Sequence, residues 1–147
     1  MSDVQEIHDL VARYADAVCR RHQEDWAATW AEDGLWQLPG APETRGRDNI
    51  VALWAGAMQN FPFVVQLINN GTVRVEGDEA TGRFYISEHM TVAGGGGRST
   101  VGVYQDRYVR TDQGWRFAER HYSILYAGGD ADMTGDVLPY PDLKWQA

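Results

Sequence analysis

The sequence has little cysteine, little positive charge and no long apolar run. Its single cysteine, Cys19, cannot form a disulfide within the chain. Lys and Arg number 13 against 21 Asp and Glu, and the resulting net charge of -8 repels phosphate backbones and anionic membranes. No segment approaches the ~20 apolar residues of a membrane-spanning helix, and the first residues lack a signal-peptide pattern. We therefore expect a cytoplasmic protein with neither nucleic acid nor membrane as a partner.

Motifs for cofactors and metals are also missing. The chain has no P-loop, no G-x-G-x-x-G, no metal-type Cys/His spacing and no internal repeat. His22, His89 and His121 have no spacing typical of a metal site or a catalytic triad, so we expect surface or capping roles for them. The sequence therefore predicts no metal and no cofactor, and its 147 residues fit one domain, 1–147.

Aromatic residues are abundant. Six Trp, seven Tyr and four Phe make up 12% of the chain. Large rings suit a ligand cavity or a subunit interface, and they also pack an ordinary core. Composition alone leaves these alternatives open.

Helical periodicity is confined to the first part of the chain. From residue 7 to 18, apolar side chains recur at spacings of three and four, which is typical of one helix face. A second short helix is predicted over 25–30. A third is expected to be capped by Asp48 and to end before Pro62. A short strand over 35–38 separates the second helix from the third.

The pattern after Pro62 indicates long strands. Val, Ile, Thr and aromatic residues are concentrated in four stretches that are separated by turn signals rich in Gly and Asp. These stretches are 63–75, 80–92, 99–110 and 115–126. Strands of this length stay packed only in a bent sheet, and the Asn-Asn-Gly segment 69–71 is the expected bulge.

Helices followed by a β-meander indicate an α+β fold. We expect a cone-shaped, curved antiparallel or mixed sheet, which three N-terminal helices close around an apolar pocket. The core is predicted to span about 5–126. The tail, 127–147, is expected to be irregular and to cover the mouth of the pocket or reach a neighbouring subunit.

Glu88 is the exception in an apolar row. Strand alternation places it on one face with Phe84, Ile86, Met90 and Val92. Removal from water raises the pKa of a carboxyl group toward the range useful for a general acid or base. Alternatively, Glu88 pairs with an arginine near the mouth, or a bulge turns it outward.

The last predicted strand adds a guanidinium and a phenol. Arg120 shares a face with Arg116 and Tyr122 if the alternation is regular. Its side chain suits a substrate oxygen or a developing oxyanion. The alternative is an ion pair with Glu88 or Asp106 that closes a polar layer of the core.

Tyr104 lies on the preceding strand in a row with small residues. Thr100 and Gly102 alternate with it, which leaves space beside its ring. A ligand fills that space as readily as a neighbouring side chain does.

Two further polar side chains lie where the pattern is apolar. Gln66 stands between Val64 and Ile68, and a buried amide needs a partner, either a ligand oxygen or the backbone. Cys19 lies near the C-terminal end of the first helix, where nothing lowers the pKa of a thiol. We therefore expect it to pack as a small apolar residue and not to act as a nucleophile.

Several short motifs follow one another in a distinctive order. They are Tyr14-Ala15-Asp16, Asp25-Trp26, Ala31-Glu32-Asp33 before Trp36, Gly46-Arg47-Asp48-Asn49-Ile50, and Tyr104 to Arg110 followed by Gly114-Trp115-Arg116-Phe117. In this order they resemble the SnoaL-like branch of the nuclear transport factor two-like superfamily, as far as about residue 126. That superfamily includes scytalone dehydratase, hexachlorocyclohexane dehydrochlorinase, ketosteroid isomerase, polyketide cyclases and bile-acid dehydratases. Most members use no cofactor, and many are dimers or trimers.

The resemblance implies acid/base chemistry on hydrophobic rings. In dehydratase-like members an Asp near the end of the first helix orients a His on the first long strand. The resemblance places Cys19 and Gln66 at those two positions. Neither a thiol nor an amide replaces that imidazole as a base near neutral pH. Trp36 and Arg120 match pocket positions of the dehydrochlorinase-like members.

We therefore expect a cofactor-independent lyase or isomerase of the dehydratase, retro-aldol or proton-transfer type. Its substrate is a small hydrophobic cyclic or aromatic molecule, and its assembly a homodimer or homotrimer. The expected catalytic residues are Glu88, Arg120 and Tyr104. The expected substrate-binding residues are Tyr14, Cys19, Trp36, Trp54, Gln66, Ile86 and Tyr122. The alternative is a non-catalytic protein that binds a small molecule or stabilises a partner, having lost the Asp/His pair.

Overall fold

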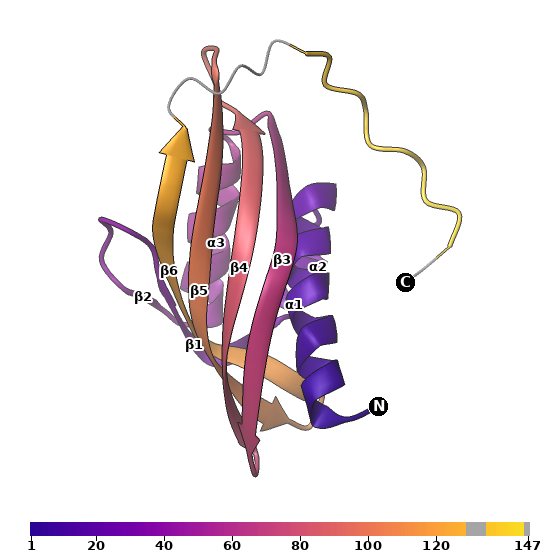
Figure 1. Ribbon diagram of the computed structural model, residues 1–147, viewed down its shortest axis with the longest axis vertical. Helices are drawn as coiled ribbons and strands as arrows, with labels where there is room; N and C mark the ends of the chain where they lie inside the picture. Colours follow the sequence, from indigo (N-terminus) through magenta and orange to yellow (C-terminus); the bar gives the residue numbers. More distant parts are fainter. Residues whose placement is uncertain (129–134, 146–147) are drawn as a thin grey trace.

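A computed structural model describes residues 1–128 and 135–145. Figure 1 shows a long, twisted sheet with the helices against one of its faces. The segment 135–145 contains no helix or strand, as predicted for the tail. The rest of the predicted tail, 129–134 and 146–147, lies outside the described residues. The last strand ends at Gly128, so the irregular segment begins later than expected.

The three predicted helices are present. Helix α1 spans Asp3–Arg20, α2 spans Gln23–Ala27 and α3 spans Arg47–Met58. A reciprocal pair of hydrogen bonds between Ser2 and Gln5 satisfies backbone donors at the start of α1. The prediction that Asp48 caps α3 is wrong, because Gly46 occupies the cap position and Asp48 lies within the first turn.

Six strands form one mixed sheet. They are β1 (Trp30–Gln37), β2 (Thr44–Arg45), β3 (Phe63–Glu76), β4 (Glu79–Thr91), β5 (Gly97–Thr111) and β6 (Gly114–Gly128), in the spatial order β2-β1-β6-β5-β4-β3. Strand β1 runs parallel to β6, and all other neighbours are antiparallel. The sequence did not predict the short β2, and β1 begins earlier than expected, at Trp30.

Bulges bend the sheet and decide which side chains face inward. The register of β3 shifts between Ile68 and Asn70, which confirms the predicted bulge. A second shift on β6 places Phe117 opposite Tyr108 and then Glu119 opposite Arg107.

This second shift turns both Phe117 and Arg120 into the interior, where each is 0% exposed. Arg116 is only partly buried and lies on the other face. The expectation that Arg116 shares a face with Arg120 is therefore wrong, because one extra residue reverses the alternation.

The core lies between the helices and the inner face of the sheet, and tryptophans dominate it. Trp26 of α2 stacks on Trp54 of α3, with ring centroids 4.7 Å apart and ring planes 12° apart. Trp30 and Trp36 of β1 pack edge-on against Trp26, at 5.9 and 5.4 Å. The predicted α+β cone is confirmed. No helix in the described part of the chain is long and apolar enough to cross a membrane.

Candidate functional site

A row of polar side chains crosses the inner face of the sheet, and three of its members are register partners on neighbouring strands. Gln66 on β3 pairs with Glu88 on β4, and Glu88 pairs with Thr100 on β5. The Tyr122 hydroxyl on β6 extends the row, 3.5 Å from the Thr100 Oγ. Side chains directly opposite one another on paired strands touch. These four residues, Gln66, Glu88, Thr100 and Tyr122, are called the polar row.

Glu88 is the only acid in the polar row. Burial raises the pKa of its carboxyl group, while the side chains of Gln66 and Tyr122 partly oppose that rise. Arg98 and Arg120 favour the ionised form only through longer-range charge, and neither forms an ion pair with Glu88. A carboxyl group in this setting takes up or releases a proton closer to neutral pH than an exposed glutamate does.

Arg120 forms a second cluster with Asp106 and is fully buried. Its Nε and Nη2 atoms donate to the two Asp106 oxygens at 2.8 and 3.1 Å, and the Tyr108 hydroxyl donates to the same carboxylate at 2.8 Å. Burial opposes the charge of Arg120, but the Asp106 carboxylate outweighs it, and the pKa of Arg120 is raised above its ordinary value. The predicted ion pair within a polar layer is therefore present, with Asp106 as its acid.

Aromatic rings surround this guanidinium. Its central carbon lies 3.7 Å from the Tyr104 ring centroid, 4.1 Å from that of Phe117 and 4.3 Å from that of Tyr14. The Tyr14 and Tyr104 hydroxyls are 3.4 Å apart. Burial raises the pKa of Tyr14 to about 12, so its phenol stays protonated near neutral pH. Stacking and the bidentate pair together fix the direction of the Arg120 side chain.

The space beside Tyr104 is filled by Tyr122. The two rings stack with centroids 4.7 Å apart. A Cβ atom built on Gly102 would overlap the Tyr122 ring, so that ring fits only because position 102 has no side chain. Of the two possibilities that the sequence left open, a neighbouring side chain therefore occupies this position.

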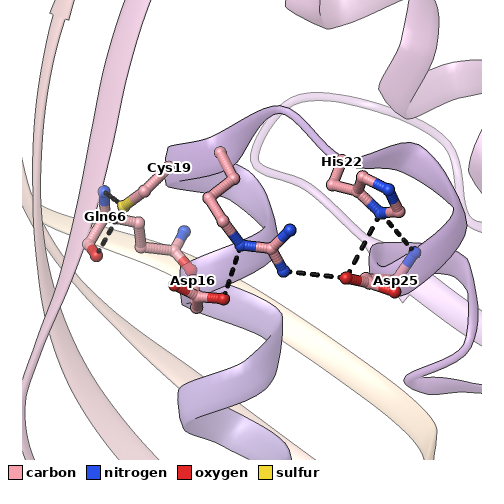
Figure 2. A network of polar contacts seen from close by, with 6 residues as sticks. Asp16, Cys19, His22, Asp25 and Gln66 are labelled. Carbon is pink, nitrogen blue, oxygen red and sulfur yellow. Dashed lines mark hydrogen bonds and ion pairs between the residues drawn. The ribbon is translucent and has the colours of Figure 1, made fainter. Parts of the chain in front are cut away.

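Cys19 and Gln66, the two residues that the sequence resemblance places at the Asp/His positions, are joined through the thiol. Figure 2 shows Cys19 against the backbone of Gln66. The Gln66 N–H donates to the sulfur at 3.4 Å, and the thiol donates back to the Gln66 carbonyl at 3.5 Å. Burial raises the pKa of the Cys19 thiol, which keeps it protonated. Cys19 thus joins α1 to β3, and its environment among the described residues does not favour the thiolate form that a nucleophile requires.

The charged groups near Cys19 form a separate surface network. Arg20 binds Asp16 and Asp25, at 2.8 Å each, and the His22 ring accepts the Asp25 backbone N–H at 3.2 Å (Figure 2). His22 therefore caps α2, as the sequence predicted.

The other predicted substrate-binding residues also belong to the interior. Trp36 and Trp54 lie in the tryptophan cluster, at 5% and 6% exposure, and Ile86 is fully buried on β4. Sequence reasoning considered Asp106 only as a partner and overlooked Tyr108. The alternation of Tyr104, Asp106 and Tyr108 along one strand was the available signal, because it places all three on one face.

Some buried polar atoms of this interior have no hydrogen-bond partner among the described residues. The acceptor is Gln66 Oε1, and the donors are Arg120 Nη1 and the indole Nε1 atoms of Trp26, Trp30 and Trp36. Buried polar groups normally have a hydrogen-bond partner. A ligand that offered matching donors or acceptors to these atoms would therefore gain binding free energy. In the same part of the chain, no three or more His, Cys, Asp or Glu residues are grouped as a metal site requires.

Comparison with known proteins agrees with this architecture. A family model described as a SnoaL-like domain matches residues 1–121. Uncharacterized proteins of Mycobacterium bovis and Mycobacterium tuberculosis are 31% identical over 125 residues, covering 82% of this chain and 84% of theirs.

Solved structures share the fold. The hexachlorocyclohexane dehydrochlorinase LinA-type3 of Novosphingobium barchaimii LL02 superimposes with a TM-score of 0.82 at 20% identity, over 92% of this chain and 94% of that one. A protein of unknown function from Mycobacterium tuberculosis gives a TM-score of 0.73 at 29% identity, over 82% of this chain and 74% of that one.

Proposed function

Because the chain belongs to the SnoaL-like family, we propose that it is a cofactor-independent lyase or isomerase. Its substrate is a small hydrophobic cyclic or aromatic molecule held in an apolar pocket beside the polar row. The observation that carries the proposal is Glu88, an acid on the inner face whose pKa burial raises and with which no cation among the described residues forms an ion pair. A structural carboxylate in such a place normally has a charged partner, whereas a proton-transfer group does not need one.

The proposed reaction begins at a carbon next to a carbonyl group of the ring. Glu88 removes a proton from that carbon, and the electron pair of the broken C–H bond moves onto the carbonyl oxygen. Arg120 stabilises the resulting enolate oxygen through the guanidinium nitrogen that Asp106 leaves free. Return of the proton to another carbon gives isomerisation, and departure of a β-hydroxyl group as water, with the proton that Glu88 holds, gives dehydration. In the retro-aldol alternative Glu88 instead removes the proton of a β-hydroxyl group, the carbon–carbon bond beside it breaks, an aldehyde leaves, and the electron pair of that bond moves onto the carbonyl oxygen.

The remaining predicted residues have supporting roles in this proposal. Tyr104 holds the guanidinium in place through its ring. Gln66 and Tyr122 flank Glu88 and orient the substrate beside it. Tyr14, Trp36, Trp54 and Ile86 supply apolar surface against the substrate ring, and Cys19 acts through the Gln66 backbone.

Hydrogen-deuterium exchange tests the proposal without knowledge of the natural substrate. The protein is incubated in D2O with a panel of cyclic and aryl ketones, with and without ring hydroxyls, and NMR follows exchange at the carbon next to the carbonyl. The Glu88→Gln variant is expected to lose 10²- to 10⁴-fold of the catalysed exchange, as is typical when a general base is removed.

Glu119→Gln is the matched control. Glu119 lies on β6, two strands away from Glu88, on the other face of the sheet, where it binds His121 and Arg107. Its loss should leave exchange unchanged. Full exchange with Glu88→Gln would show that another group is the base.

Cys19 and Gln66 at the dyad positions favour a second candidate, a non-catalytic binding protein. It predicts that ring ketones bind, with quenching of tryptophan fluorescence, while neither exchange nor product appears with any of them. A single turned-over substrate would exclude it.

A further inference from the structure

Arg98 is a cation in an otherwise apolar row on the inner face of the sheet. It pairs with Met90 on β4, and Met90 pairs with Val64 on β3. Met90 and Val64 are buried, whereas Arg98 is partly exposed, so a ligand from solvent can reach its guanidinium. The pairing of β5 with β4 has no register shift, so Arg98 faces the same side as Thr100, two residues further along the strand. The apolar row therefore lies directly beside the polar row.

Arg98 has no counter-charge in the part of the chain that the structure describes. It forms neither an ion pair nor a side-chain hydrogen bond there. Burial raises the pKa of Glu88 and of Tyr122, and the charge of Arg98 opposes that rise in both groups. The sequence left open whether Glu88 pairs with an arginine. Arg98 is close enough to influence Glu88 electrostatically, but the two side chains do not form that ion pair.

The register sets the spacing between this cation and the acid. Glu88 pairs with Thr100, so Arg98 is the diagonal neighbour of Glu88 on the same face. Diagonal neighbours on paired strands are about 7–8 Å apart, which is within reach of long side chains. A ligand that contacts both groups must therefore carry its anionic group and its proton-donating carbon on different sides of one ring.

Electrostatics explain why an acidic ligand needs Arg98. The chain has a net charge of -8, and an ionised Glu88 repels a second carboxylate nearby. A guanidinium binds a carboxylate through two parallel N–H···O bonds, and its charge offsets that repulsion. Binding also cancels the effect of Arg98 on Glu88. The pKa of Glu88 then rises further, and the carboxylate becomes a stronger base while the ligand is bound.

We infer that Arg98 is a specificity-determining residue that binds a carboxylate substituent on the substrate ring. The inference rests on the proposed function and deepens it: the substrate class is a cyclic keto acid. Its carboxylate binds Arg98, while the carbon next to its ketone group contacts Glu88. Arg120 differs from Arg98 because the Asp106 carboxylate already balances its charge.

Binding of 2-naphthoate tests the inference without any reaction. This ligand combines an aromatic ring with a carboxylate, and methyl 2-naphthoate is its uncharged counterpart. Calorimetry should show that the wild-type protein binds the carboxylate about tenfold or more tightly than the ester. Arg98→Met keeps an unbranched side chain and removes the charge. It should weaken naphthoate binding about 10- to 100-fold, as expected for hydrogen bonds to a charged group, and leave ester binding unchanged.

Arg83→Met is the matched control. Arg83 is an exposed residue of β4 that precedes the buried Phe84, so it faces the outer side of the sheet. Its loss changes the net charge of the chain by the same amount, and both ligands should bind as they do to the wild type. Equal losses in the two variants would show a general effect of charge and overturn the inference. A wild-type protein that does not prefer the carboxylate would overturn it as well.

NMR of the wild-type protein gives a second measurement that does not depend on the folding of Arg98→Met. Naphthoate should shift one arginine Nε–H resonance, and the ester should not. That resonance should be absent from the spectrum of Arg98→Lys, which retains the positive charge and should retain most of the preference for naphthoate. A shift of the Arg120 resonance instead would contradict the assignment.

The binding experiment and the exchange experiment can fail separately. Naphthoate has no hydrogen on a carbon next to a ketone, so its binding does not require Glu88 to act as a base. Arg98-dependent binding without exchange of any ketone would support the carboxylate site and contradict the proposed reaction. Catalysed exchange of neutral ketones by a protein that does not prefer naphthoate would overturn the carboxylate site alone.

Discussion

Asp106 and Glu88 both face the interior of the sheet, and among the residues that the structure describes only Asp106 forms an ion pair there. Burial raises the pKa of Asp106 on β5 and of Glu88 on β4. Asp106 is compensated by Arg120 and by the Tyr108 hydroxyl. The ionised form of Glu88 is favoured by the uncharged side chains of Gln66 and Tyr122 and, at longer range, by the charges of Arg98 and Arg120. Two carboxyl groups on the same face of the sheet therefore differ in their environment, which the neighbouring side chains determine.

The comparison separates a structural acid from a candidate catalytic one. Asp106 binds Arg120 through two hydrogen bonds, and the remaining guanidinium nitrogen, Nη1, has no hydrogen-bond partner among the described residues. In the proposed function Glu88 exchanges a proton, and no ion pair among the described residues holds it in one ionisation state. Substitutions at the two acids should therefore differ in both size and sign.

The largest effect is expected from breaking the ion pair. Asp106→Leu leaves Arg120 charged, buried and unpaired, so the free energy of unfolding should fall by about 3–5 kcal/mol in urea titrations. The double variant Asp106→Leu, Arg120→Met removes both charges, and it should recover most of that loss. If Asp106→Leu lowered the free energy of unfolding by less than about 1 kcal/mol, the ion pair would have to be hydrated. Asp106 would then not be the structural acid that the comparison with Glu88 requires.

A smaller effect is expected where Tyr122 fills the space beside Tyr104. Gly102→Ala places a methyl group against the Tyr122 ring and should destabilise the fold by about 1–3 kcal/mol, with displacement of Tyr122 from the polar row. The control is Gly56→Ala on α3, where nothing lies within 4 Å of the added carbon. That change should stabilise the protein by about 0.5–1 kcal/mol, because alanine is the better helix former. A neutral Gly102→Ala would show that Tyr122 moves freely.

The smallest expected effect is on the pH dependence of stability. Its sign should differ between Glu88, on the inner face of the sheet, and Glu119, on the other face. The pKa of Glu88 is raised in the folded protein, so folding favours the protonated acid and stability is lost as pH rises from the ordinary carboxyl range through the raised pKa. Glu88→Gln should therefore be more stable than wild type at neutral pH, by about 1 kcal/mol, and equal to it in acid.

Glu119 provides the opposite case. His121 and Arg107 lower its pKa, so its contribution is present above the ordinary carboxyl pKa and is lost as pH falls through the lowered value. Glu119→Gln should thus be slightly less stable than wild type at neutral pH. Unfolding curves measured between pH 4 and 8 compare the two variants, and the same sign for both would refute the assigned environments.

Much of this site followed from strand alternation. Gln66, Glu88 and Tyr104 face inward as their positions predicted, because no bulge interrupts the alternation in the segments that contain them. Arg116 was misplaced because the bulge on β6 lies between it and Arg120. The choice of Asp106 as the partner of Arg120 depended on pairing between β5 and β6, which local pattern does not reveal.

The sequence by itself determined the helix faces, the long strands, the bulge after Ile68 and the presence of one acid in an apolar row. These features depend on local spacing, turn chemistry and side-chain polarity, which the chain carries in its order of residues. Only the tertiary structure decided which acid has a cation, which ring fills the space over Gly102, and that Trp36 stands beside Arg120. Those relations arise from the register between strands distant in sequence, and a single extra residue in any strand would change them.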